Sequence, residues 1–106
     1  MPVDVLVSCL MVTLPSPHRL AFLKRAIAAY CAQTYSSREL VIVLDQGTAE
    51  AKAAIMDHVA TLGRVDVRII ESPRAMSLGA LRNLSRAGAR GKVHCQWDDD
   101  DLHHPQ

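Results

Sequence analysis

Four consecutive aspartates, Asp98 to Asp101, are the residues of this chain whose type and spacing point most directly to chemistry. They follow a short apolar run, Val93 to Trp97, that is typical of a buried strand. Two carboxylates about 4 Å apart repel by ~1 kcal/mol in water and by ~4 kcal/mol near a protein surface, unless a cation lies between them. The run therefore predicts a site for a hard divalent metal ion.

An extended chain would divide these carboxylates between two faces. Alternate side chains of a strand point the same way, so Asp98 and Asp100 would share one face, and Asp99 and Asp101 the other. One face could then hold a metal ion while the other meets a ligand. The alternative is a solvated acidic loop, which needs no ligand.

The elements that must position this run alternate along the chain. Apolar runs of strand length are Val5–Val12, Leu40–Leu44, Val65–Ile70 and Val93–Trp97, and helical patterns are Leu20–Cys31, Ala51–Leu62 and Leu78–Ala89. Thr48 is expected to cap the second helix and Gly63 to end it. The order predicts an α/β fold of three-layer, Rossmann-like type, with a mainly parallel sheet of about four strands and helices on both faces.

A sheet of this kind binds ligands outside the carboxyl ends of its strands, where the strand order reverses. Each expected strand is followed by polar or charged residues, at Thr13, Asp45, 71–74 and 98–101. The topology would bring these groups together along one edge of the sheet.

Composition narrows the classes of protein. A chain of 106 residues can bury the core of one domain but not of two. Its formal charge of +1 argues against a nucleic-acid binder that relies on bulk charge. The N-terminal apolar run is too short to span a bilayer and lacks the basic start of a signal peptide.

The chain has three cysteines, Cys9, Cys31 and Cys95, which is an odd number, and they form no C-x-x-C pair. We therefore expect reduced core residues of a cytoplasmic protein, not a disulfide frame or a zinc site.

The string Val7 to Thr13 resembles the opening strand of family 2 glycosyltransferases, which have the GT-A fold and use nucleotide sugars as donors. Further similar segments follow in the family's order: Ala26-Ile27, Gln33-Thr34-Tyr35, Glu39-Leu40, Leu44 to Thr48, Gly79 to Asn83, and Gly91 ahead of Asp98 to Asp101. The resemblance implies that residues 1–106 form a donor-binding domain for a nucleoside-diphosphate sugar, usually a UDP-sugar, together with Mn²⁺ or Mg²⁺.

The resemblance also implies roles for individual residues. Asp100 matches the metal-binding carboxylate of the family's D-x-D motif, and Asp98 or Asp99 would accept hydrogen bonds from ribose hydroxyls. Asp45 and Gln46 align with paired acids after the second strand, the second of which typically reads the uracil edge. Gln46 departs from that pattern, although its amide can both donate and accept.

Other matching positions would line the nucleotide. Thr13 aligns with a threonine that contacts the nucleoside, and Leu14 follows it where the family usually has a tyrosine, so base stacking must come from elsewhere or be lost. Arg82 matches an arginine that could reach a phosphate or orient Asp98, although it could equally be a solvated surface charge. Arg74 is a weaker candidate for the base or a phosphate.

In the family, a carboxylate from the second half of the fold removes the acceptor's proton, and the anomeric configuration inverts. That base would lie beyond Gln106, so no catalytic residue is expected in this chain, which is predicted to be the donor-binding half of an inverting hexosyltransferase with little transfer by itself. Surface left by a missing second half could support a homodimer. The alternatives are a metal-dependent nucleotidyltransferase, disfavoured because no glycine-rich loop follows the first strand, and a non-catalytic nucleotide-binding module.

Overall fold

The fold is given by a computed structural model that describes residues 5–15 and 19–97. Three strands alternate with three helices before a final short strand: β1 (Val7–Thr13), α1 (Leu20–Cys31), β2 (Arg38–Leu44), α2 (Ala49–Leu62), β3 (Val67–Glu71), α3 (Leu78–Gly88) and β4 (Val93–Gln96). The expected order of elements is confirmed. The predictions for Asp98, Asp99 and Asp100 lie outside the described residues.

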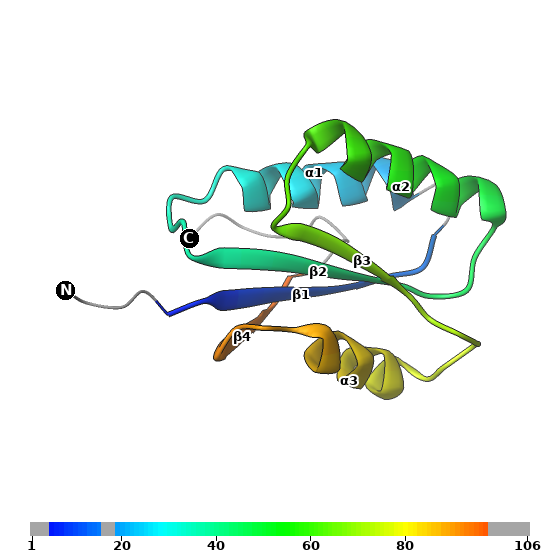
Figure 1. Cartoon of the computed structure of the whole chain (residues 1–106). Helices are drawn as coiled ribbons and strands as arrows, with labels where there is room; N and C mark the ends of the chain where they lie inside the picture. Colours follow the sequence, from blue (N-terminus) through cyan, green and yellow to red (C-terminus); the bar gives the residue numbers. More distant parts are fainter. Residues whose placement is uncertain (1–4, 16–18, 98–106) are drawn as a thin grey trace.

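The four strands form one parallel sheet with the order β3-β2-β1-β4. Helices α1 and α2 cover one face of the sheet and α3 covers the other (Figure 1). This arrangement confirms the predicted three-layer α/β fold. The chain adds β2 and β3 on one side of β1 and then crosses to add β4 on the other, so the strand order reverses between β1 and β4.

The main core lies between the sheet and the helix pair α1 and α2. Alternate residues of the central strands point into it, and they meet apolar side chains of the two helices: Cys9, Met11, Leu40, Ile42, Leu44, Leu23, Ile27, Tyr30 and Ile55. Every residue from Leu40 to Leu44 is fully buried because β2 is covered on both faces. This explains why β2 is a continuous apolar run without the alternation of a half-exposed strand.

Helix α2 begins and ends at the capping residues that the sequence predicted. The Thr48 side chain accepts a hydrogen bond from the Ala51 backbone N–H at 3.1 Å, and Gly63 ends the helix in the left-handed conformation, with φ of 63°. Both predictions are confirmed. None of the helices in the described part of the chain has the length and apolar character that a membrane crossing requires.

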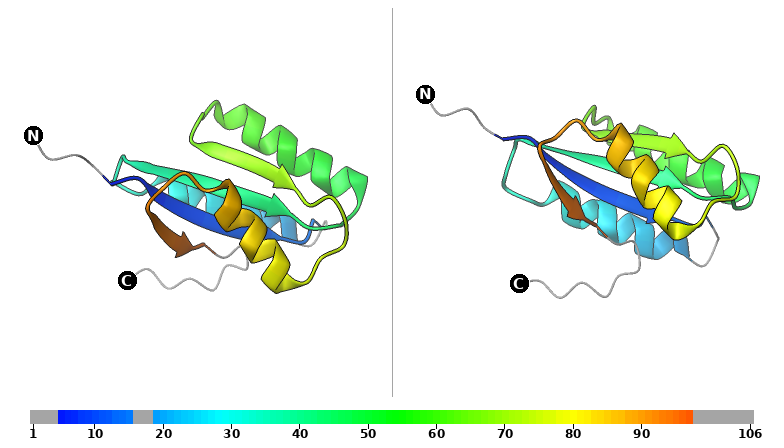
Figure 2. Two further views of the ribbon diagram at one scale, coloured as in Figure 1. Left: turned by 60° about the horizontal axis from the view of Figure 1, so that its bottom comes forward. Right: turned by 90° about the horizontal axis from the view of Figure 1, so that it is seen from below.

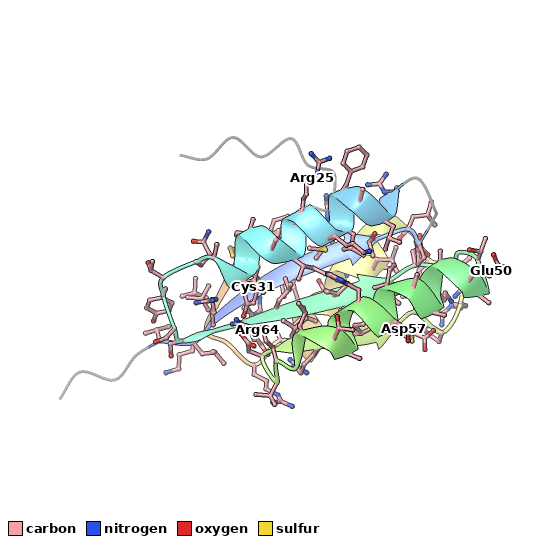
Figure 3. The ribbon with its side chains drawn as sticks, turned by 90° about the horizontal axis from the view of Figure 1, so that it is seen from above. Arg25, Cys31, Glu50, Asp57 and Arg64 are labelled. Carbon is pink, nitrogen blue, oxygen red and sulfur yellow. The ribbon has the colours of Figure 1, made fainter. Side chains whose placement is uncertain are left out.

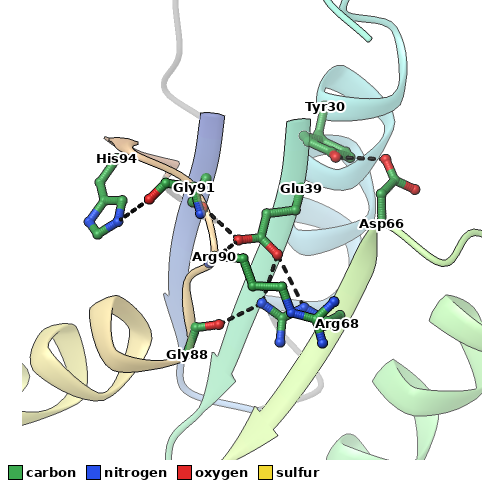
Figure 4. Close-up of polar contacts among 9 residues, drawn as sticks. Tyr30, Glu39, Asp66, Arg68, Gly88, Arg90, Gly91 and His94 are labelled. Atoms are coloured by element: carbon green, nitrogen blue, oxygen red, sulfur yellow. Dashed lines mark hydrogen bonds and ion pairs between the residues drawn. The ribbon is translucent and has the colours of Figure 1, made fainter. Parts of the chain in front are cut away.

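A buried carboxylate joins the amino-terminal ends of the strands on the α3 side (Figure 4). Glu39 is 5% exposed, and its Oε1 accepts hydrogen bonds from Arg68 Nη2 at 2.7 Å and Nε at 3.2 Å. Its Oε2 accepts from Ser8 Oγ and from the Arg90 backbone N–H, both at 2.6 Å. Ser8 Oγ in turn accepts from the Gly91 N–H at 2.8 Å. Glu39 therefore links β1, β2 and β3 to the segment that leads into β4.

Candidate nucleotide-sugar site

The carboxyl ends of neighbouring strands are tied together by backbone hydrogen bonds. The Asp45 N–H donates to Thr13 O at 2.8 Å, and the Ser72 N–H donates to Leu44 O at 2.9 Å. Asp45 and Ser72 are the first residues after β2 and β3. The polar groups that follow β1, β2 and β3 are therefore brought together at one edge of the sheet, at the end toward which these strands run in Figure 2, whereas the predicted group at 98–101 lies outside the described residues.

Gln46 connects the loops that follow β2 and β3. Its Nε2 donates to the backbone oxygen of Ser72 at 3.1 Å and to Ser72 Oγ at 3.2 Å. Its backbone N–H donates to Asp45 Oδ1 at 2.7 Å. Ser72 is 4% exposed, and the sequence indicated it only as one residue of the polar segment 71–74 that follows the third expected strand. The arrangement fixes the amide nitrogen of Gln46 and directs its side chain along the edge of the sheet.

Gly47 lets the loop after β2 lie directly against the loop after β1. A Cβ atom at Gly47 would be 2.4 Å from the backbone oxygen of Pro15 and 2.9 Å from its Cβ. A side chain at this position would force the two loops apart. The glycine thus holds Leu14 and Pro15 next to Asp45 and Gln46.

The remaining candidate residues differ in exposure. Thr13 is 2% exposed, so its side chain lies beneath the surface, whereas the neighbouring Leu14 is 49% exposed. Arg74 is exposed in the loop between Ser72 and α3, and Arg82 is exposed in the second turn of α3. Leu14 therefore offers apolar surface at the edge of the site, and the two arginines offer positive charge on the α3 side.

Trp97 fixes the chain at the point where it leaves β4. Its backbone N–H donates to Leu10 O at 2.8 Å, and its indole Nε1–H donates to Ala26 O of α1, also at 2.8 Å. The indole meets the ring of Tyr30 edge to face, with centroids 6.3 Å apart. Trp97 is therefore packed at the end of β4, but the prediction of a buried strand over Val93–Trp97 is wrong, because β4 is an edge strand in which Cys95 is half-buried and the other three residues are exposed. The acidic run begins one residue after Trp97.

The sequence profile described as Glycosyl transferase family 2 matches residues 11–106, which is most of the chain. The chain belongs to glycosyltransferase family 2. The comparison with curated proteins finds no match.

Solved glycosyltransferases share the fold. A mannosyltransferase from Pyrobaculum calidifontis, solved with GDP-Man and Mn²⁺, superposes with a TM-score of 0.79 at 16% identity over 92% of this chain. GalNAc-T7, solved with UDP, GalNAc and Mn²⁺, gives a TM-score of 0.78 at 19% identity over 91%, and S. aureus TarS residues 1–349 give 0.68 at 18% over 90%. At these identities the likeness shows the GT-A fold of this family 2 chain, which spans 28%, 18% and 27% of the three structures.

Proposed function

We propose that this chain is the donor-binding part of an inverting hexosyltransferase. It binds a nucleoside-diphosphate sugar, and specifically a UDP-sugar, with Mn²⁺ or Mg²⁺. The observation that carries the proposal is the reversal of strand order between β1 and β4, because the acidic run follows β4 directly. Membership of glycosyltransferase family 2 supports the same conclusion.

Chain geometry supports a shared site for the acidic run and the ends of β1 and β2. The Trp97 N–H is hydrogen-bonded to Leu10 O, and Thr13, the last residue of β1, is three positions beyond Leu10. Asp100 is likewise three positions beyond Trp97, and that length of extended chain spans at most about 11 Å. Asp100 is therefore within reach of the edge formed by Thr13 and Asp45.

The chemistry of the donor set fits a hard divalent ion. The candidate ligands are the consecutive aspartates after Trp97. Carboxylate oxygens are the ligands that Mg²⁺ and Mn²⁺ favour. Asp100 would hold the ion, and Asp98 or Asp99 would accept hydrogen bonds from the ribose. A bound ion would neutralise charge on the departing diphosphate.

Residues of the first two loops would bind the nucleoside. Gln46 Nε2 is engaged by Ser72, and the amide oxygen can accept the N3–H of uracil. Asp45 lies beside it, and the exposed side chain of Leu14 offers apolar surface for one face of the base. Arg74 and Arg82 are the cations available to the phosphates.

Calorimetric titration with UDP tests the proposal. We expect binding in the presence of Mn²⁺ that weakens at least tenfold in Asp100→Ala and after removal of the metal with EDTA. The matched control is Asp57→Ala, which removes an exposed carboxylate on α2 (Figure 3) and should leave the affinity unchanged. GDP titrated under the same conditions should bind more weakly than UDP.

Two results would count against this assignment. If Asp100→Ala and the parent chain bound UDP with equal affinity, Asp100 would not be the metal ligand. If the chain bound UDP and GDP with equal affinity, Gln46 would not select the base.

A further inference from the structure

Two of the three cysteines, far apart in the sequence, meet on adjacent strands. Cys9 of β1 and Cys95 of β4 are directly paired in the parallel register of the sheet. The Cys95 thiol donates to Cys9 Sγ, with 3.3 Å between the two sulfur atoms. Neither thiol has a part in the donor-binding proposal.

We propose that Cys9 and Cys95 are a modification site, at which a reversible disulfide joins the edge strand β4 to β1. Neighbouring strands lie about 4.8 Å apart, which is within the Cα separation of about 4.4 to 6.8 Å that disulfides span. The sulfur atoms must approach each other by about 1.3 Å to reach the bonded distance of about 2.0 Å. Because the two residues are already in register, side-chain rotation rather than strand movement can bring the sulfurs together.

A solvent-open pocket gives an oxidant access to this pair. The pocket has a volume of about 260 Å³, and its lining includes Cys9, Cys95, Arg38 and Trp97. Cys9 is 5% exposed whereas Cys95 is half-buried, so Cys95 is the thiol that a reagent reaches first. The guanidinium of Arg38 at the same pocket would attract an anionic oxidant such as glutathione disulfide.

The exchange with glutathione disulfide balances in two steps. The deprotonated sulfur of Cys95 attacks one glutathione sulfur, a Cys95–glutathione bond forms, and the other glutathione leaves as a thiolate that takes up a proton. Cys9 then attacks Cys95 Sγ, the Cys95–glutathione bond breaks, and the departing second glutathione takes up the proton that Cys9 loses. The two protein thiols are oxidised by two electrons, and one glutathione disulfide is reduced to two glutathione molecules.

The third cysteine provides an internal comparison. Cys31 lies at the carboxyl end of α1 (Figure 3) and lines a different groove, between α1 and α2, together with His58 and Leu62. It has no register partner in the sheet, because it belongs to a helix. Cys31 therefore has no neighbouring thiol in the sheet with which to form an internal disulfide, and any glutathione bound to it would not be displaced by a second cysteine.

Peptide mapping after treatment with glutathione disulfide tests the proposal. Trypsin separates the three cysteines, because cleavage after Arg19, Arg25, Arg38 and Lys92 places them in peptides 1–19, 26–38 and 93–106. We expect the oxidised chain to be two hydrogens lighter, to keep one of three thiols titratable, and to yield peptide 1–19 linked to peptide 93–106. Dithiothreitol should restore all three thiols.

Variants separate the proposed pair from nonspecific oxidation. Cys31→Ser should form the same linked peptides, whereas Cys95→Ser and Cys9→Ala should form none. Three free thiols after treatment, a linkage that includes Cys31, a disulfide between two chains, or glutathione retained on Cys95 would each overturn the assignment. Since the readout is the mass of peptides, it is independent of whether the chain binds a nucleotide.

Discussion

Replacing Glu39 by glutamine is expected to destabilise the fold strongly, although it changes the side chain by a single atom. Glu39 accepts four hydrogen bonds, two from Arg68 and one each from Ser8 Oγ and the Arg90 N–H. If the glutamine oxygen stays with Arg68, its NH₂ group faces the Arg90 N–H, which is also a donor. One charge-assisted hydrogen bond is lost, and two buried donors are forced together.

The magnitude follows from these contacts. A hydrogen bond to a charged group contributes about 1.5 to 3 kcal/mol, and the pair with Arg68 also loses its charge attraction. We expect a loss of about 3 kcal/mol, which for a domain of this size lowers the melting temperature by roughly 12 to 24 °C. Urea unfolding followed by circular dichroism gives the free energy directly. Glu71→Gln is the matched control, because Glu71 has a half-exposed side chain 3.9 Å from Lys52 and should change stability by less than about 0.5 kcal/mol.

The stability difference between the parent chain and Glu39→Gln should also depend on pH. Burial raises the pKa of Glu39, but hydrogen bonds from Ser8, Arg90 and Arg68 outweigh burial and lower this pKa below its usual 4.5. The carboxylate therefore stabilises the fold fully above pH 4.5, and this contribution is lost as the pH falls through the lowered pKa of the native state. The difference between parent and variant should shrink below pH 4.5. A loss under 1 kcal/mol at pH 7, or a difference that does not depend on pH, would refute the reasoning.

Two glycines give further predictions. Gly91→Ala should destabilise the chain by about 1 to 3 kcal/mol in urea unfolding, because the new Cβ would lie 2.5 Å from Leu6 O and from Ser8 Oγ, whereas Gly79→Ala in the open first turn of α3 should not destabilise it. Unchanged stability in Gly91→Ala would show that the β4 segment can move away from β1. Gly47→Ala should also destabilise the chain in urea, because its Cβ would lie 2.4 Å from Pro15 O, and it should weaken UDP binding of the folded chain in calorimetry by separating the loops after β1 and β2; undiminished binding would place the nucleoside away from these loops.

The order of helices and strands could be predicted from the sequence because it depends on apolar runs and capping residues within short segments. The unbroken apolar run from Leu40 to Leu44 indicated a strand buried on both faces, and Thr48 and Gly63 marked the ends of α2 because capping depends on immediate neighbours. Strand β1 begins at Val7 and ends at Thr13, later than predicted at both ends, because pairing with β2 sets these limits.

Contacts between distant segments could not be predicted in the same way. Glu39 and Arg90 are 51 residues apart, and Cys9 and Cys95 are 86 apart, so no pattern within a window of the sequence joins them. The three cysteines were predicted to be reduced core residues, and all three are free thiols, but their odd number gave no indication that two of them are paired in register on adjacent strands. The edge formed by Asp45, Gln46 and Ser72 was predicted only in outline, since the Gln46 contact with Ser72 depends on the register of β2 and β3.

The position of Trp97 has a practical consequence. It is the sole tryptophan of the chain, its indole is held by Ala26 and Tyr30, and it directly precedes the first aspartate of the acidic run. A paramagnetic ion such as Mn²⁺ quenches a nearby fluorophore, whereas diamagnetic Mg²⁺ does not. The fluorescence of Trp97, recorded with each ion in turn, would thus report whether a metal ion is bound next to the indole ring, and no fluorescent label needs to be attached.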